Sequence, residues 1–271
     1  MFRFVKIILF FAIIASVSSC SKYQKLVKKG SPDQKYDAAL TYYAKDDFYH
    51  SQQLFDELIV LLRGTDKLEK AYYYYAQTYY KQNDYMIASY HFKYFAKTFP
   101  KSEYAEECLY LSAYCKYLDS PPANLDQSST KTAIVEMQMF INMYPNSPKV
   151  DEANDIMDGL RKKIVVKDFE NAKQYLTTQY YKAAVYAFER HLKNYPGSPF
   201  KEEAMFLTIE ADYVYASKSI HYKQNERYTK TLADYNDYIA KYPDGRFVKQ
   251  AEKLRNSAKH SIEKIKNKKQ L

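Results

Sequence analysis

The chain has 271 residues and a formal net charge of +9, with 31 tyrosines, no tryptophan and only five glycines. So few glycines argue against an all-β fold and against an α/β fold built on glycine-rich loops, and the length suits one extended solenoid or two compact domains. We therefore expect a helical protein whose apolar surface carries many hydroxyl groups, each of which needs a hydrogen-bond partner or a groove to face.

The first 19 residues have the pattern of an export signal that ends at a lipid-attachment cysteine. Two basic residues precede an apolar run of 11 residues, 7–17, which is too short to span a bilayer as a permanent helix. Small residues then lead into Cys20 and resemble a lipobox, in which the thiol is acylated with fatty acids such as palmitate. We expect a signal peptide over 1–19, acylation at Cys20 and a lipidated linker over 20–31. A plain secretory signal and a short membrane anchor are the alternatives.

A short phrase recurs along the rest of the chain: an aromatic residue, a proline, any residue, then serine or glycine. The aromatic residue ends one helix, the proline prevents its continuation, and the small or polar residue caps the next helix. The prolines of this phrase are Pro100, Pro145, Pro196 and Pro243.

A helix is expected to open fifteen residues before each of these prolines. Upstream, a fifth helix fits the same frame, but no proline follows it. Three residues after each opening comes a small side chain, where two helices would cross closely. Self-similarity of this kind is typical of a helical solenoid, in which each hairpin buries its apolar face against its neighbours. The second helices of the five units are expected to start near residues 48, 85, 130, 181 and 228.

The second unit resembles the tetratricopeptide repeat when Glu69 is taken as its first position. The longer later units need insertions, namely a loop over 119–129 and an extended first helix over 150–176. A basic helix over 247–266 would cap the array. The predicted fold is therefore an all-α, tetratricopeptide-repeat-like solenoid of about five helix hairpins, spanning 32–271.

Catalytic and metal-binding chemistry finds little support in the sequence. The five histidines never fall within four residues of one another, and the glycines are too scattered for a phosphate loop. Cys108 and Cys115 would lie about 10.5 Å apart along one helix, too far for a disulfide, and are expected to be buried small hydrophobic residues. We expect a binding scaffold with no catalytic residue, no metal site and no cofactor.

Positive charge is concentrated at the C-terminus, where residues 246–269 hold nine basic and two acidic residues. A nucleic-acid-binding protein would spread its basic surface across the fold, so we expect no nucleic-acid partner. The segment is either a solvated terminal helix or a docking surface for an acidic partner or for anionic lipid headgroups. Lys253, Arg255 and Lys259 are the candidate docking residues.

The first helices of a tetratricopeptide array line its inner surface, and the resemblance places mainly tyrosines there in the first three units. Such a surface offers flat apolar area together with hydroxyl groups, which suits an extended peptide with aromatic side chains. The alternative is that these rings simply pack between helices. The candidate groove residues are Tyr36, Tyr43, Tyr73, Gln77, Tyr80, Tyr110, Tyr114 and Tyr117.

Taken together, the acylated cysteine, the repeats and several short segments resemble the BamD family, the tetratricopeptide-repeat lipoproteins of the outer-membrane β-barrel assembly machine, and most closely its Bacteroidetes branch. The segments are residues 23–26, 54–58, 117–121 and 125–127. The resemblance implies a non-enzymatic protein at the periplasmic face of the outer membrane. It further implies that the C-terminal repeats bind the periplasmic domains of a BamA-like barrel protein and that the N-terminal repeats receive unfolded outer-membrane β-barrel proteins.

Two other functions fit a lipid-anchored repeat protein. One is a periplasmic tetratricopeptide adaptor that coordinates cell-envelope division or peptidoglycan synthesis. The other is a nutrient-capture lipoprotein with a helical-repeat core, but such chains are much longer and usually carry tryptophan for sugar stacking, which is absent here.

Overall fold

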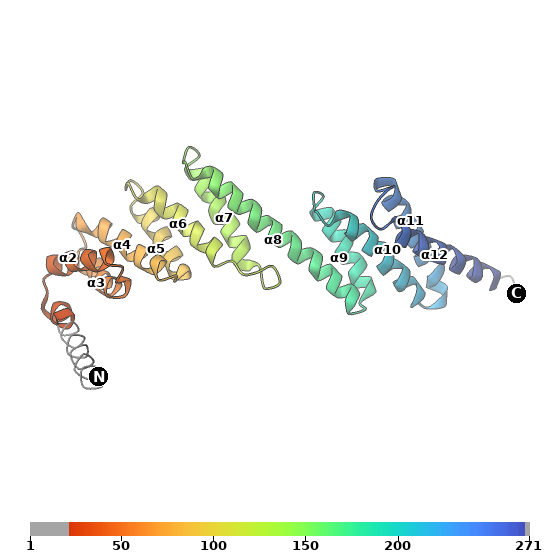
Figure 1. Cartoon of the computed structure of the whole chain (residues 1–271), viewed down its shortest axis with the longest axis horizontal. Coiled ribbons are helices and arrows are strands. Elements are labelled where there is room, and N and C mark those ends of the chain that lie inside the picture. The colour runs from red at the N-terminus through yellow and green to blue at the C-terminus, as the bar shows by residue number, and fades with distance from the viewer. Residues whose placement is uncertain (1–21, 269–271) are drawn as a thin grey trace, which may run out of the picture. The chain divides into compact units, whose positions relative to one another are not determined.

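The structure is a computed structural model that describes residues 22–268. These residues form helices joined by turns and short loops, without a strand among them, and the predicted all-α solenoid of helix hairpins is confirmed (Figure 1). Residues 22–29 are helical. The helices that follow are α2 (Pro32–Ala44), α3 (Phe48–Leu61), α4 (Lys67–Lys81), α5 (Tyr85–Thr98), α6 (Ala105–Leu118), α7 (Ser128–Met143), α8 (Val150–Thr177), α9 (Tyr181–Asn194), α10 (Lys201–Ser217), α11 (His221–Lys241) and α12 (Val248–Lys268).

The chain divides into two compact units. The first contains the described residues up to Pro121 together with 127–160, and the second contains 122–126 and the described residues from Arg161 onward. Within the first unit each helix from α2 to α7 packs against the next, and within the second unit the same holds from α9 to α12. Successive helices run antiparallel, as hairpins (Figure 1).

Three of the second helices, α3, α5 and α9, begin at the residues that the proline frame predicts, Phe48, Tyr85 and Tyr181. Helix α7 begins two residues before the expected residue 130. Helix α11 begins at His221, seven residues before the expected residue 228, because the intervening segment contains neither proline nor glycine to stop a helix.

The small residues of the repeat frame lie where paired helices approach closely. All are fully buried, and the large side chains four residues further on fill the cores beside them. The serine and threonine members satisfy their hydroxyl groups locally; for example, Ser51 Oγ donates to the carbonyl oxygen of Ala39 at 2.9 Å. The small residues are Ser51, Ala88, Ala133, Ala184 and Thr231, and the large ones are Phe55, Phe92, Met137, Phe188 and Tyr235.

Three hairpins turn through a residue with left-handed backbone, placed just before the N-cap of the second helix. These residues are Asp46, Asn83 and Gln179, with φ values of 59°, 64° and 66°. Asp and Asn tolerate this conformation better than most residues, because their short polar side chains bond the nearby backbone. Gln179 has no such advantage, so its turn carries a conformational cost.

The serine of the recurring phrase closes the turn before the next helix in three successive units, rather than capping the helix itself. Ser102, Ser147 and Ser198 each accept a hydrogen bond from the backbone N–H two residues further on, at 3.1, 3.2 and 3.1 Å. Acidic side chains also bond the turns: Glu202 accepts from the Tyr238 hydroxyl and from the N–H of Arg246, at 3.1 and 2.5 Å. A side-chain hydrogen bond therefore holds the turn after each of these prolines, from the serine after Pro100, Pro145 and Pro196 and from Glu202 after Pro243.

Cys108 and Cys115 are both free and fully buried, as expected. Burial raises the pKa of each thiol, that of Cys115 to about 12. Both therefore remain protonated and act as small apolar side chains.

Candidate functional site

The first helices of the first unit bring four aromatic rings together in what we call the first tyrosine cluster: Tyr43, Tyr73, Tyr74 and Tyr104. Ring centroids lie 4.8 Å apart between Tyr43 and Tyr74, 5.3 Å between Tyr74 and Tyr73, and 4.3 Å between Tyr73 and Tyr104. All four rings are half-buried. Rings from α2, from α4 and from the residue that precedes α6 thus form one continuous aromatic surface.

Polar groups fix the orientation of this cluster. The Tyr73 hydroxyl donates to the Glu107 carboxylate at 3.1 Å and accepts from Gln77 Nε2 at 3.0 Å, so it links α4 to α6. Burial, followed by the charge of Glu107, raises the pKa of Tyr73. Burial also raises the pKa of Tyr43, to about 12. Both hydroxyls therefore stay protonated at neutral pH and can donate hydrogen bonds.

A second tyrosine cluster consists of Tyr80, Tyr110, Tyr114 and Tyr117. Ring centroids lie 5.7 Å apart between Tyr110 and Tyr114 and 5.6 Å apart between Tyr114 and Tyr117. Tyr80 of α4 packs against the core cluster that contains Cys115 of α6, and burial, followed by neighbouring Tyr114, raises its pKa. The two clusters extend over the same three first helices from which the sequence predicted a binding surface.

The predicted residues are not equally accessible. Tyr43, Tyr73, Tyr80, Tyr114 and Tyr117 are half-buried, and a partner could reach them. Three others are buried: Tyr36, with Lys67 Nζ above its ring at 5.3 Å, Gln77 and Tyr110.

Tyr110 belongs to a core cluster rather than to a free surface. Its ring meets Phe140 of α7 at a centroid distance of 5.3 Å, and Lys149 Nζ lies 5.3 Å from its centre. Burial and the carboxylate of Glu152 raise the pKa of its hydroxyl. The part of the surface that a ligand could contact is therefore smaller than the sequence predicts.

Tyr74 and Tyr104 are part of the first cluster but were not among the predicted residues. Tyr74 follows a predicted contact position, and its ring stacks on Phe55 of α3 at 6.1 Å. Tyr104 lies outside α6, at the N-cap, where a helical frame assigns no contact. The only sequence signal for them was the run of four tyrosines at 72–75 and the aromatic residue at position 104.

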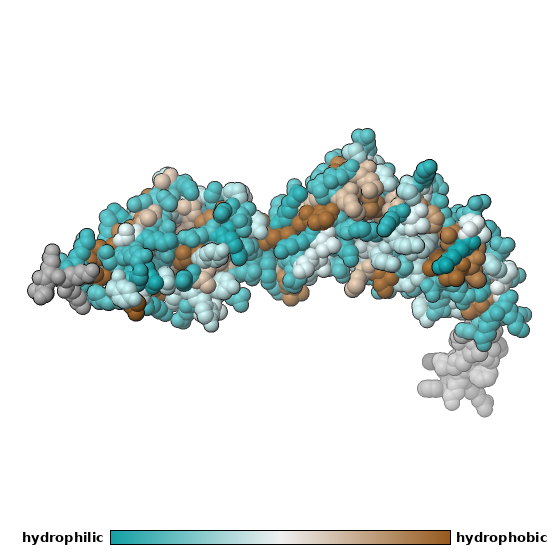
Figure 2. All heavy atoms as spheres, turned by 180° about the vertical axis from the view of Figure 1, so that it is seen from behind, coloured by the Kyte–Doolittle hydropathy of each residue, from teal (hydrophilic) through white to brown (hydrophobic). Residues whose placement is uncertain are grey.

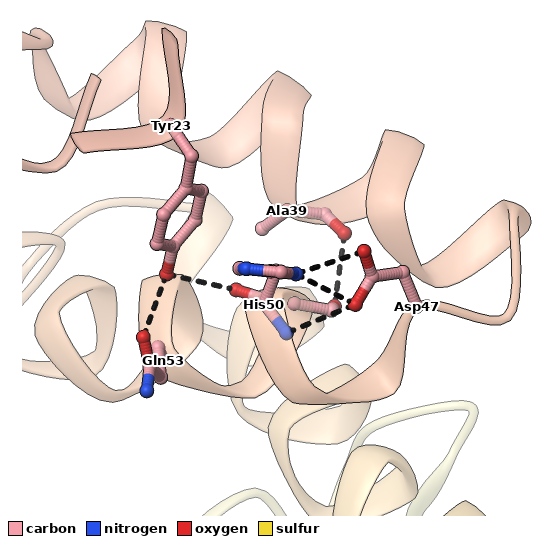
Figure 3. A network of polar contacts seen from close by, with 6 residues as sticks. Tyr23, Ala39, Asp47, His50 and Gln53 are labelled. Atoms are coloured by element: carbon pink, nitrogen blue, oxygen red, sulfur yellow. Dashed lines mark hydrogen bonds and ion pairs between the residues drawn. The ribbon is translucent and has the colours of Figure 1, made fainter. Parts of the chain in front are cut away.

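Residues 22–29 form a docked helix, where the sequence predicted a linker over 20–31. Figure 3 shows the contacts that hold it: Tyr23 points into the first hairpin, and its hydroxyl donates to Gln53 Oε1 at 2.9 Å. Its ring lies 4.3 Å from the ring of His50, which is in turn bonded to Asp47 at 2.8 Å. Cys20 and the predicted signal peptide lie outside the described residues.

Apolar side chains also reach the surface away from the tyrosine clusters. Figure 2 shows hydrophobic areas among the hydrophilic ones. On α5 the large exposed side chains are Met86, Ile87, Tyr90 and Tyr94, and α7 carries Val135 and Met143 beside a shallow apolar hollow. Within residues 22–268, no helix is both long enough and apolar enough to cross a bilayer.

The predicted docking residues lie on α12, whose buried side chains, Ala251, Ala258 and Ile265, face the second unit. Lys253 and Lys259 are exposed. The Arg255 guanidinium lies 5.3 Å above the ring of Tyr235 and is half-buried, so its position also serves packing. Two of the three predicted residues are thus free to meet a partner.

One buried polar group in the second unit has the connectivity of a catalytic triad. His191 Nδ1 lies 3.0 Å from Asp168 and His191 Nε2 lies 2.9 Å from Ser198 Oγ. Ser198 Oγ, however, already accepts from Phe200 N–H in the turn before α10, and His191 is fully buried. We therefore assign these residues to packing. Over residues 22–268 there is also no cluster of side chains suited to a metal ion.

Comparison with known proteins adds a family to this geometry. A family model with the description outer membrane lipoprotein matches residues 28–226 and, in a second alignment, residues 175–266. The two matches together take in nearly all of the described helices. None of the curated proteins compared with the chain matches it.

Proposed function

The chain belongs to the YfiO family of outer membrane lipoproteins. We therefore propose that it is a non-enzymatic scaffold of the outer-membrane β-barrel assembly complex. The observation that carries the proposal is the extent of the family match, which runs through the described repeats of both units. It supports the resemblance to the BamD-like lipoproteins, whereas the Bacteroidetes branch stays a prediction. A solenoid of this kind offers long surfaces to several partners at once.

We propose that acyl chains on Cys20 anchor the protein in the outer membrane, with the solenoid in the periplasm. Ser21 follows the cysteine, so the aspartate that retains lipoproteins in the inner membrane of enteric bacteria is absent. The Cys20→Ala chain should take up no fatty-acid probe and should fail to remain in the membrane fraction, because acyl chains supply the membrane affinity. Label that persists on the Cys20→Ala chain would contradict the anchor.

The tyrosine clusters are the proposed contact surface for unfolded β-barrel proteins. A barrel strand is an extended peptide of alternating residues, many of them aromatic, and both clusters present half-buried rings to such a peptide. Ring-to-ring contact and a hydrogen bond donated to the peptide backbone by the Tyr43 hydroxyl would then act together.

Peptide binding tests this surface directly. Alanine at Tyr73 and Tyr114 together should weaken binding of a C-terminal barrel-strand peptide by about 1–3 kcal/mol, the range of an anchor residue in an interface. Fluorescence anisotropy measures the affinity, and circular dichroism checks that the helix content is retained. Tyr90→Ala is the matched control, since Tyr90 is a tyrosine of the same unit that is 65% exposed and outside both clusters. Equal affinity of the double variant and the control would assign the clusters to packing alone.

The second unit is the proposed docking site for the periplasmic domains of a BamA-like barrel protein. Lys253→Glu with Lys259→Glu should slow association and weaken its salt dependence, because both ammonium groups are exposed and long-range attraction is screened by salt. Lys97→Glu with Lys101→Glu, two exposed lysines of the first unit, is the control. An unchanged association rate at low salt would make α12 a solvated cap.

Co-purification from solubilised outer membranes decides between this proposal and the envelope-division adaptor. Recovery of the barrel protein of the assembly complex supports the scaffold role. Recovery of division or peptidoglycan-synthesis proteins in its place would overturn it.

A further inference from the structure

The helix over residues 22–29 carries a dense cluster of positive charge at the start of the described chain. Lys22, Lys25, Lys28 and Lys29 are all exposed, and we call these four residues the lysine face. The segment 22–32 contains no acidic residue. Within the part of the chain that the structure describes, none of the four lysines forms an ion pair, whereas nearby Lys35 and Lys67 pair with Glu57 and Asp33.

The four lysines occupy one side of the helix. At 3.6 residues per turn, successive residues are rotated by about 100°, so the lysines fall within an arc of about 120°. The opposite side carries Tyr23, Leu26 and Val27, which pack into the core of the first hairpin. The helix is therefore amphipathic, with its apolar side covered by protein and its charged side free.

The direction of the lysine face is fixed relative to the first hairpin. Tyr23 is 6% exposed and bonded to Gln53, which holds the start of the helix. At its other end the chain turns at Gly30, where a Cβ atom would lie 2.5 Å from the carbonyl oxygen of Leu26. Ser31 then opens α2 with reciprocal bonds to Gln34, at 3.2 and 3.0 Å. Neither end of the helix is a free tether.

The lysine face lies next to the proposed point of lipid attachment, and the inference rests on that attachment for its proximity to a membrane. Lys22 is two residues from Cys20, so even a fully extended backbone separates them by only about 7 Å. This is within the Debye length of about 8 Å at physiological ionic strength. Lysine ammonium groups are strongly hydrated point charges, and they can attract phosphate groups while they stay hydrated.

We propose that the lysine face binds the anionic headgroups of the phospholipid bilayer in which the acyl chains of Cys20 are inserted. The acyl chains supply the attachment, and the four ammonium groups set the orientation. The first hairpin, with its part of the first tyrosine cluster, then stands on the membrane in a fixed direction rather than swinging on a linker.

Amine-labelling of the acylated full chain on vesicles tests the proposal. The chain is reconstituted on vesicles of phosphatidylcholine and on vesicles that also contain phosphatidylglycerol, and the labelling rate of each lysine is followed by mass spectrometry. The four lysines should be labelled several-fold more slowly on the anionic vesicles, and high salt should remove this protection. Lys97 and Lys101, exposed lysines elsewhere in the first unit, should be labelled at the same rate on both.

Lys25→Gln with Lys29→Gln should reduce the protection of Lys22 and Lys28, and Lys97→Gln with Lys101→Gln should leave it unchanged. Equal labelling of the lysine face on neutral and anionic vesicles would overturn the proposal. Protection that requires a co-purified protein rather than anionic lipid would also overturn it.

Vesicle flotation separates a failure of the anchor from a failure of the lysine face. A chain that does not float with neutral vesicles lacks the acyl anchor and contradicts the proposed lipidation. Its lysines can still be labelled in the presence of anionic vesicles, where salt-sensitive protection supports the lysine face and its absence refutes it.

Discussion

In the first unit, tyrosine and histidine rings pack together between α4 and α5, whereas in the second unit a lysine meets three carboxylates where α9, α10 and α11 approach. His91 of α5 is surrounded by Tyr72, Tyr75 and Tyr79, with ring centroids 4.7–5.8 Å away, and burial lowers its pKa. By contrast, Lys230 of α11 lies 3.0 Å or less from the carboxylates of Glu189, Asp212 and Asp234.

One repeat frame thus accepts two kinds of side chain between its helices, aromatic rings or paired charges. Aromatic rings stabilise the fold through the apolar area that they bury, and they tolerate small shifts of geometry. This stabilisation depends little on pH or salt. Buried ions stabilise the fold only when each charge is paired with an opposite charge, and this pairing depends on the protonation state of each group. The first unit should therefore respond to changes in volume, and the second to changes in charge.

The largest effect is expected when the central cation of the second unit is removed. Above about pH 8, where Asp212 is ionised, Lys230→Met should lower the free energy of unfolding by about 2 kcal/mol, because it leaves the 3% exposed Asp212 side chain without its counterion. The value lies below the range for fully buried pairs, since the Lys230 side chain is 42% exposed. Urea denaturation measures it.

Lys223→Met is the matched control, because Lys223 pairs only with Glu226 on the surface of the same helix. It should change the free energy by no more than about 0.5 kcal/mol. Similar losses in the two variants would mean that the buried ions of the second unit are not specifically stabilising.

A change of volume should act on the first unit. Ala88→Leu should destabilise by about 1–3 kcal/mol, because Ala88 is fully buried where α5 meets its neighbours and the added atoms have no space. Ala44→Leu, on an exposed position of α2, should leave the melting temperature unchanged. An unchanged melting temperature for Ala88→Leu would show that the repeat frame is misplaced.

Removing a single hydroxyl group from the ring network should cost less. Tyr75→Phe keeps the buried ring and loses the hydrogen bonds to Asp56, at 2.7 Å, and to Tyr79, at 3.1 Å. We expect a loss of about 1 kcal/mol by thermal denaturation, since Asp56 is exposed and water can replace its partner. Tyr90→Phe, on an exposed ring, should cost nothing measurable. A loss well above that of Ala88→Leu would mean that the first unit depends on polar matching after all.

The last prediction concerns pH. Burial, followed by Asp234, raises the pKa of Asp212 to about 8, and Lys230 only partly offsets this. The folded state therefore keeps a proton that the unfolded state releases near pH 4, so the contribution of Asp212 to stability falls as the pH rises toward about 8.

Asp212→Asn should flatten the decline of the melting temperature between about pH 5 and 8. Asp237→Asn, at an exposed position of α11, should leave the parent profile intact. Parallel profiles of melting temperature against pH for the parent chain and Asp212→Asn would refute the assignment of this decline to Asp212.

The elements that could be predicted from the sequence are those set by short-range sterics. Proline stops a helix whatever surrounds it, and a small residue at a helix crossing is needed in any repeat, so the starts of α3, α5 and α9 could be read from Phe48, Tyr85 and Tyr181. The predicted start of α11 was wrong by seven residues, because no proline or glycine between His221 and residue 228 stops the helix there.

The accessibility of each ring could not be predicted, because it depends on neighbours far along the chain. Tyr110 has the same spacing as the accessible tyrosines, yet it is buried by Phe140 of the next helix. Tyr104 joins the first cluster from outside any helix. The pairing of Asp212 with Lys230 is equally invisible in the sequence, since it depends on the packing of α10 on α11.

The stacked rings of the tyrosine clusters also make the protein its own optical probe. The chain contains no tryptophan, so a tryptophan placed in a bound peptide would be the sole indole emitter in the sample. Excitation absorbed by Tyr73 and Tyr104, whose rings are 4.3 Å apart, would pass to that indole only while the peptide lies beside them. The emission would then report binding beside tyrosine rings, without any dye attached to the protein.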